Sequence, residues 1–294
     1  MKIALTVLVA VMLFVVLHTR TGLRMLYVDQ VRMSLQRVVP DNAITESDLE
    51  PLPLQIKRYL QYVGVTAGQN RVKNFRASFK GVMRKSIDTP WMKFTSEQTS
   101  FFDIPSRFYY LRASLFGLPF QAVETYVGSE ASMQVKIDSL FRVMDAVGPE
   151  LNQSETVTLF NDMCFLAPAT LISPNIQWQV IDLNRVRATF TNAGNSISAE
   201  LVFNDLGQLI NFTSDDRYRT TFGKTFKKLH WSTPIREYQH FGAYRIGSRG
   251  EARWQLPGEN DFAYIRLELL KIEYNIKNIS DKSTKGNLAN AVQR

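Results

Sequence analysis

Residues 185–213 read RVRATFTNAGNSISAELVFNDLGQLINFT, three segments of alternating apolar and polar residues separated by two polar turns. The first two segments place apolar side chains at every second position, namely Val186, Ala188 and Phe190, then Ile197, Ala199, Leu201 and Phe203. Successive side chains of a β-strand point to opposite faces, so a period of two predicts strands with one buried face. The connecting residues 192–195 and 204–207 contain the Asn, Asp and Gly that favour tight turns. This stretch therefore predicts an antiparallel meander.

The same alternation recurs along most of the chain. Residues 74–84 place Phe75, Phe79 and Met83 on one face and polar side chains on the other. We predict further strands at residues 92–102, 107–115, 120–127, 133–137, 178–181, 231–241, 251–256 and 263–276. Short connections imply antiparallel pairing, and an open twisted sheet of about ten or more strands tends to curl. The expected fold class is mainly β (α+β), a large curved antiparallel sheet or half-barrel.

Two helices are predicted within this β-rich sequence. Residues 53–64 begin with a proline, end with a glycine and place apolar side chains on one helical face, at Ile56, Tyr59, Leu60 and Val63. Residues 154–172 carry a second helical face, which consists of Val157, Phe160, Asn161, Cys164 and Ala167. We expect Ser154 to cap this helix and Pro168 to limit it. A helix between strands of one sheet must cross a face of that sheet, and we expect it on the concave face.

The N-terminal residues 3–17, IALTVLVAVMLFVVL, form an uninterrupted apolar run without charge. A full membrane span needs about 20 residues, which the run reaches if it extends to Leu26 with Arg20 and Arg24 directed toward the interface. A signal peptide has a core of similar length, but no small-x-small cleavage motif precedes Arg20. We therefore predict an uncleaved single-pass anchor in residues 1–26, which places the protein at a membrane. The charges on its two sides are too similar to predict its orientation.

The predicted domain comprises residues 52–276. Before it, residues 27–51 are expected to form a juxtamembrane helix and a linker. The spacing of Val28, Val31, Leu35 and Val38 predicts an amphipathic helix over residues 25–38. After the domain, the polar residues 277–294 lack periodicity and are expected to be disordered.

Composition narrows the classes of function. Of the 294 residues, 45% are apolar and 12% aromatic, which supplies a sizeable core. The single cysteine, Cys164, excludes an internal disulfide and is expected to be a buried small side chain. The formal charge of +8 is carried by separated Lys and Arg residues, which argues against a nucleic-acid partner. Such a surface suits ordinary solubility or proximity to anionic lipid.

Few residues could carry catalysis or hold a metal. The three histidines, His18, His230 and His240, lack a partner motif, so we expect no metal site. We find no nucleophile elbow and no phosphate-binding glycine loop, and we predict no cofactor and no catalytic residue. The charged run DDRYR at residues 215–219 leaves an enzymatic alternative, in which Asp216 and Tyr218 act with a nearby arginine. A salt bridge at a strand end is the commoner meaning of such a run.

Aromatic side chains occur on almost every predicted strand. In a curved sheet, such side chains and a few polar groups would line a large apolar cavity. The residues predicted to bind a ligand there are Phe108, Tyr110, Trp178, Arg217, Tyr218, Trp231, Tyr238, Trp254 and Tyr264. In the alternative interpretation, the same aromatic residues are ordinary core packing.

Three elements together carry a family resemblance: LPLQIKRYLQYVGV at residues 52–65, the DDRYR run and the strand that contains Trp254. They resemble an uncharacterised bacterial family of membrane-anchored, β-rich proteins with the pattern LP-x4-RYL-x-Y-x-GV. The resemblance implies an alternating β-rich body with a helix near its middle, and it implies no assigned activity. In architecture alone, the expected fold is similar to the lipoprotein-carrier half-barrels of bacterial envelopes. A shared architecture does not transfer function.

The sequence supports one main function and two alternatives. The main hypothesis is a non-enzymatic, membrane-anchored module of the cell envelope that holds a lipid or other lipophilic ligand between sheet and helices. The first alternative is an envelope scaffold or interaction domain with a filled core, whose protein partner the sequence does not identify. The second is the enzyme built on Asp216 and Tyr218. An inner volume large enough for an acyl chain favours the main hypothesis, and a smaller one favours the scaffold.

Overall fold

The computed structural model describes residues 22–279 except 116, 138–140, 222 and 259–260. The described strands form one fourteen-stranded sheet in the order β6-β5-β4-β3-β2-β1-β14-β13-β11-β10-β9-β8-β7, with β12 paired to β13. The strands are β1 (Asn74–Met83), β2 (Met92–Phe101), β3 (Ser106–Leu115), β4 (Leu118–Val127), β5 (Glu130–Ile137), β6 (Phe141–Val147), β7 (Ile176–Val180), β8 (Arg185–Asn192), β9 (Asn195–Phe203), β10 (Leu209–Thr221), β11 (Thr225–Ser232), β12 (Ile235–Phe241), β13 (Tyr244–Trp254) and β14 (Phe262–Tyr274).

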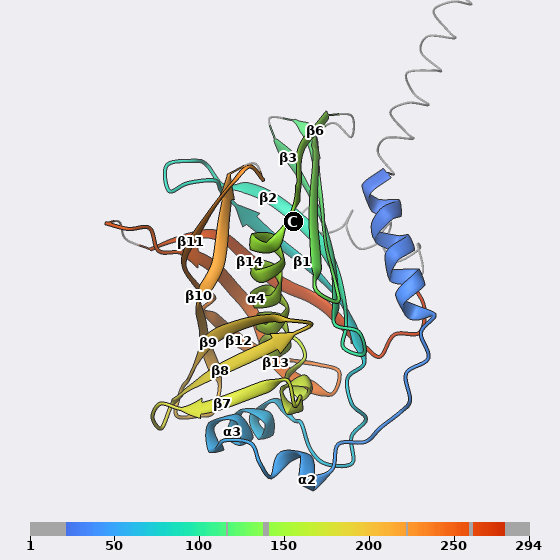
Figure 1. The fold of residues 1–294 in the computed structure, drawn as a ribbon, viewed down its shortest axis with the longest axis vertical. Helices are drawn as coiled ribbons and strands as arrows, with labels where there is room; N and C mark the ends of the chain where they lie inside the picture. The colour runs from blue at the N-terminus through green and yellow to red at the C-terminus, as the bar shows by residue number, and fades with distance from the viewer. Residues whose placement is uncertain (1–21, 116, 138–140, 222, 259–260, 280–294) are drawn as a thin grey trace, which may run out of the picture.

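The sheet curls around one long helix, α4 (Pro149–Phe165), which lies on its concave face (Figure 1). Neighbouring strands pair antiparallel throughout the described sheet. The pairing of β1 with β14 joins the N-terminal strands β1–β6 to the C-terminal strands. The predicted curved antiparallel sheet with a helix across its concave face is therefore confirmed.

Most predicted strands are present, although β13 begins seven residues before the predicted 251 and β10 continues beyond the predicted end of the meander to Thr221; two further differences have local causes. The predicted strand over residues 231–241 is wrong, because β11 ends at Ser232 and β12 begins at Ile235. Pro234 lies in the gap, and a proline has no backbone N–H to continue a ladder. Strand β6 was not predicted, because its sequence FRVMDAV does not alternate cleanly between apolar and polar residues.

Helix α4 begins earlier than the predicted start at Ser154, which is a correction. Its N-cap is Gly148, whose φ of 123° suits glycine, and Pro149 occupies the first turn. Ser154 lies inside the helix, where its hydroxyl donates to the Glu150 carbonyl at 2.8 Å and accepts from the Tyr218 backbone N–H at 2.9 Å. The serine therefore links α4 to β10. The helix ends at Phe165, and a 3-10 helix, η1 (Pro168–Ile172), follows it.

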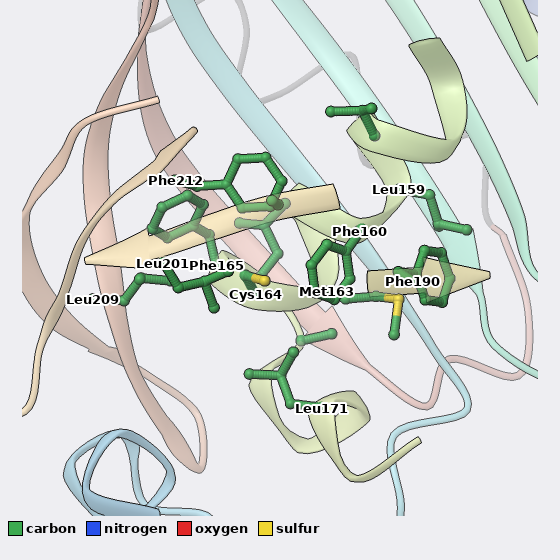
Figure 2. Packing of buried hydrophobic residues seen from close by; sticks show 14 of the residues in the cluster. Leu159, Phe160, Met163, Cys164, Phe165, Leu171, Phe190, Leu201, Leu209 and Phe212 are labelled. Atoms are coloured by element: carbon green, nitrogen blue, oxygen red, sulfur yellow. The ribbon is translucent and has the colours of Figure 1, made fainter. Parts of the chain in front are cut away.

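The apolar core surrounds α4 with side chains from both halves of the sheet, including Phe75 of β1 and Tyr126 of β4, and one part of it lies between α4 and strands β7–β10. Phe160 of α4 is fully buried, and its ring centroid lies 5.1 Å from that of Phe190 and 5.8 Å from that of Phe212. Trp178 adds a third aromatic contact at 6.5 Å. Figure 2 shows this packing, with Phe160 and Cys164 among the labelled side chains. Cys164 is completely buried, as predicted, and burial raises its pKa.

Two short helices close the lower end of the core. The helix predicted from residues 53–64 is α3 (Leu54–Val63), which ends at Gly64 with a φ of 87°. The four apolar side chains of its predicted face are buried, and the Tyr59 hydroxyl donates to the Cys164 carbonyl at 2.7 Å. Helix α2 (Glu46–Leu49) precedes it with a capping box at Thr45. The prediction of this helix and of its docking against the domain is confirmed.

A further helix, residues 22–35, packs on the convex face of the sheet. The Tyr27 hydroxyl lies 2.8 Å from that of Thr99, and Arg24 Nη1 lies 3.0 Å from Glu97 Oε1. Val28 and Val31 are buried, as the amphipathic pattern predicts. Val38 is 95% exposed and follows the end of the helix, so its assignment to the apolar face is wrong.

The predicted anchor, residues 3–17, lies outside the described residues, as do residues 280–294 of the predicted disordered tail. In residues 22–279, apart from the gaps given above, no helix has the length and apolar character needed to cross a membrane.

Replacing Phe160 with Ala should lower the free energy of unfolding by about 3–5 kcal/mol, because the cavity would lie inside a closely packed aromatic group. Urea denaturation would measure this. Leu206→Ala is the matched control, because Leu206 is 70% exposed and should change stability little. A loss for Phe160→Ala as small as that of the control would contradict the packing described here.

Candidate functional site

The concave face of the sheet carries a second apolar cluster, which adjoins the main core around α4 through Met133, Met144, Ile265 and Leu267. Four of its residues are buried, and others around them are only partly buried. We call this region the upper apolar wall; it consists of Phe94, Leu111, Ala122 and Val135 with Met83, Tyr109, Ala113, Phe120, Met133, Met144, Ile265 and Leu267 around them. These residues belong to β1–β6 and β14, and among the described residues the cluster includes none from α4.

The wall depends on close approach of the strands at Gly81. A Cβ atom at this position would lie 2.6 Å from the Phe94 ring, too close for any real contact. Glycine therefore lets the Phe94 ring lie flat against β1, where a side chain would otherwise displace it. The neighbouring register places Met83 opposite Ile265 of β14, so apolar side chains continue across the junction of the two sheet halves.

The β10–β11 hairpin approaches the wall from the opposite side. A Cβ atom on Gly223 would lie 2.9 Å from the Ala146 Cβ and 3.2 Å from Met144 Cγ, so this turn contacts β6. Arg219 of the same hairpin donates to the Lys85 carbonyl at 3.2 Å, after the end of β1. The hairpin thus contacts the N-terminal strands at two places, β6 and the segment that follows β1.

A buried ionic cluster lies between the wall and α4. Arg107 of β3 contacts three carboxylates, with N···O distances of 2.9 Å to Glu124, 3.0 Å to Glu155 and 2.9 Å to Asp162. Gln98 of β2 donates to Asp162 at 2.7 Å. Two of these carboxylates come from α4, so this Arg107 cluster joins the helix to β2, β3 and β4.

Burial sets the protonation behaviour of the Arg107 cluster. Desolvation raises the pKa of Glu155 and of Asp162, and the positive charge of Arg107 only partly opposes this effect. Burial of Arg107 lowers its pKa, but the negative charges of the three carboxylates outweigh this effect, so the pKa of Arg107 is raised. Arg217 lies 3.9 Å from Glu155 and adds a second positive charge. A buried charge network of this kind stabilises a fold only while every member keeps its partner.

Four of the predicted ligand-binding residues form one contiguous group. The Arg217 guanidinium lies 4.5 Å from the Trp231 ring centroid, and Trp231 donates its indole N–H to the Tyr264 hydroxyl at 3.1 Å. Tyr264 stacks on Trp254 with centroids 5.6 Å apart. Arg217 also donates to the Ser154 carbonyl at 2.9 Å. This group holds β10, β11, β13 and β14 against α4.

The other five predicted residues lie elsewhere. Phe108 and Tyr110 are buried on the convex face, where Tyr110 stacks on Tyr27 at 6.0 Å. Tyr238 packs edge-on against Tyr62 of α3 at 5.4 Å, and Trp178 belongs to the core around Phe160. Tyr218 follows Arg217 on β10 and points to the opposite face of that strand. The nine residues therefore do not line one site, and ligand binding by any of them stays a prediction.

The carboxylates of the enzymatic alternative have structural partners. Asp216 Oδ1 lies 2.7 Å from Lys228 Nζ, and Asp216 Oδ2 accepts the Ser198 backbone N–H at 2.7 Å. These bonds hold the bulge at which β10 shifts its register against β11. Asp215 pairs with His230 at 2.7 Å. Within the part of the chain that the structure describes, no group of three His, Cys, Asp or Glu side chains is placed to hold a metal ion.

Sequence reasoning missed the wall and the Arg107 cluster. The alternation that predicts β2 and β3 contains the signal for Phe94 and Leu111, but alternation does not say which face of a strand is concave. A hollow of about 590 Å³ lies at the other end of the fold between α2 and α3 and is lined by Glu46, Leu49, Glu50, Lys57, Leu60, Gln61, Val65, Thr66 and Ala67. Its lining mixes charged and apolar groups.

The architecture defines a half-barrel of antiparallel strands with a central helix. Residues 42–267 match the family described as "Family of unknown function (DUF6544)", and the chain belongs to this family. This confirms the resemblance to a family without an assigned activity. No curated protein matches the chain.

Two solved structures are similar to the fold at low identity. One is a DUF1329 family protein from Desulfovibrio piger, with 11% identity and a TM-score of 0.43, covering 81% of this chain and 95% of that chain. The other is a domain named for outer membrane lipoprotein sorting, from Vibrio parahaemolyticus, with 8% identity and a TM-score of 0.42, covering 75% of this chain and 92% of that chain.

Replacing Arg107 with Met should lower the free energy of unfolding by about 3–5 kcal/mol at neutral pH, because three carboxylates lose their buried partner. A carboxyl whose pKa is raised on folding contributes stability at low pH and loses it as the pH rises. The cost of the substitution should therefore shrink as the pH falls toward the ordinary glutamate pKa of 4.5. Urea denaturation over this range would measure both effects.

Arg112→Met is the control for this prediction, because Arg112 is an exposed residue of the same strand. It should cost little at any pH. A cost for Arg107→Met that stays constant with pH would contradict the account of the Arg107 cluster.

Proposed function

We propose that this protein is a non-enzymatic, membrane-tethered module that holds the hydrocarbon part of a lipophilic ligand against the upper apolar wall. The observation that supports this most is the partial burial of the wall, where Met133 and Met144 remain incompletely covered by the protein. An apolar concave surface of this kind gains free energy when hydrocarbon covers it, at about 0.8 kcal/mol per buried CH₂ group.

The concave face beside β7–β10 does not suit the same role. There α4 packs with fully buried side chains such as Val157, Leu159 and Phe160. A ligand chain would have to displace this packing, and filled cores of this density resist such displacement. The ligand site is therefore proposed above the N-terminus of α4 and not beneath the helix.

The composition of the wall also suits a flexible hydrocarbon. Three of its partly buried residues are methionines, Met83, Met133 and Met144. Methionine side chains are unbranched and adapt their shape to a variable partner. A ligand defined by its apolar chain is therefore favoured over one recognised by a fixed pattern of hydrogen bonds.

The scaffold alternative also has an observation in its favour, which is the filled core beneath α4. The two functions differ in what the wall does. A ligand module needs the wall to take up hydrocarbon, whereas a scaffold needs only the wall's contribution to stability. Binding measured at the wall separates them.

A fragment of residues 22–279, purified without detergent, should bind a fluorescent fatty acid, because the wall is incompletely covered. The double variant Met133→Gln/Met144→Gln should bind about tenfold more weakly or worse, since each buried unpaired amide costs about 1–3 kcal/mol. Fluorescence titration would measure the affinity, and native mass spectrometry would detect a ligand that co-purifies.

Leu183→Gln is the matched control, because Leu183 is 81% exposed and lies far from the wall in the β7–β8 turn. It should bind as the unsubstituted fragment does. A folded fragment that takes up no fatty acid would instead favour the scaffold.

A further inference from the structure

One end of the half-barrel exposes large apolar side chains on its turns. The antiparallel order places the β1–β2 connection, the start of β4 at Leu118 and the start of β6 at Phe141 at the same end of the sheet. We call this end the upper rim (Figure 1). Ile87 is 54% exposed there, Leu118 is 51% exposed and Phe141 is 67% exposed. Three large apolar side chains at adjacent turns form an exposed apolar surface, and such surfaces mark sites that contact a partner or a membrane.

The upper rim is also basic. Lys85, Lys93, Arg112 and Arg142 lie at or beside these turns and are exposed, and Lys136 is half-buried. Among the described residues of these turns the acidic ones are fewer: Asp88 lies in the β1–β2 connection, and Asp145 pairs with Arg142, while Asp138 lies outside the described residues. Apolar tips surrounded by an excess of cations match the boundary of an anionic bilayer, where apolar groups enter the acyl region and cations meet the headgroups.

The other end of the fold has exposed apolar tips but different charges. Leu183 is 81% exposed and Leu206 is 70% exposed, each in a turn beside α3. Asp182 directly precedes the first and Asp205 directly precedes the second. Carboxylates at the tips oppose approach to an anionic surface. Arg185 pairs with Asp182 at 2.8 Å and Lys57 of α3 is exposed, so the α3 end carries both signs of charge, whereas cations are in excess among the described residues of the upper rim.

The position of the N-terminal helix agrees with this assignment. A Cβ atom on Gly22 would lie 3.9 Å from Lys136 Nζ, so the helix begins beside the upper rim. It runs down the convex face for about 21 Å, toward Arg37, which bonds to Asp103 in the β2–β3 turn. The apolar run of residues 3–17 ends five residues before Gly22.

From these observations we propose that the upper rim lies against an anionic lipid surface, with Leu118 and Phe141 at the headgroup boundary and the surrounding Lys and Arg residues on lipid phosphates. This contact is additional to the predicted anchor. It fixes the orientation of the half-barrel, since the end with the rim faces the bilayer. The inference does not depend on the proposed ligand, although the upper apolar wall lies toward the same end.

The test places a nitroxide on single cysteines in the full chain, reconstituted in vesicles of phosphatidylcholine with phosphatidylglycerol. Labels at Leu118→Cys and Phe141→Cys report the rim, and labels at Leu183→Cys and Leu206→Cys report the α3 end. All four positions are exposed, and the native Cys164 is completely buried and should take no label. Collision with lipid-dissolved oxygen measures the depth of each nitroxide.

We expect the rim labels to collide with oxygen several-fold more often than the labels at the α3 end. The charge-reversal variant Lys85→Glu/Arg112→Glu should bring the rim labels down to the level of the others. Lys57→Glu/Arg187→Glu, which makes the same charge change away from the rim, should leave them unchanged.

Two results would overturn the proposal. One is equal oxygen collision at both ends of the fold. The other is equal contact in vesicles of phosphatidylcholine alone, which would exclude recognition of an anionic surface. Either result leaves the fatty-acid measurement unaffected, because that experiment uses substitutions on the wall and no bilayer.

Discussion

The fold depends on helix α4, which presents two chemically different sides to the two halves of one curled sheet. On one side Phe160 packs among aromatic rings of β8 and β10. On the other side Glu155 and Asp162 bind the buried Arg107 of β3. The apolar contact supplies most of the stabilisation, and the ionic contact sets the position of the helix, because an unpaired buried charge is costly.

The same arrangement creates the proposed site. Helix α4 begins at Pro149 and packs into the main core, which Met133 and Met144 also contact, and the upper apolar wall continues from them over β1–β6 and β14 without a residue of α4. The Arg107 cluster separates the two regions and makes the boundary polar. A ligand chain on the wall would therefore meet charged groups at its inner limit, which restricts it to the end of the half-barrel that carries the upper rim.

Alternation of residues predicted most of this fold and little of the site. The period of two located the meander from Arg185, and the pattern around Tyr59 located α3 with its glycine end. The concave face could not be predicted, because it depends on the curl of the whole sheet. Arg107 looks like a solvent-facing residue within an alternating strand, and its burial depends on carboxylates from β4 and α4 that are distant in sequence. Likewise, the sequence could not show which side of β3 buries Phe108 and Tyr110. They are buried on the convex side, because the helix of residues 22–35 covers them there.

The central claim is that hydrocarbon binds the wall above α4 and not the core beneath it. Methyl NMR of methionine, recorded while residues 22–279 are titrated with a fatty acid, tests this directly. Met83 lies on the wall alone, Met133 and Met144 lie on the wall where it adjoins the main core, and Met163, buried in α4, reports the core. The account predicts that the Met83, Met133 and Met144 signals shift and that the Met163 signal does not. A shift confined to Met163, or no shift at all in the folded protein, would contradict it.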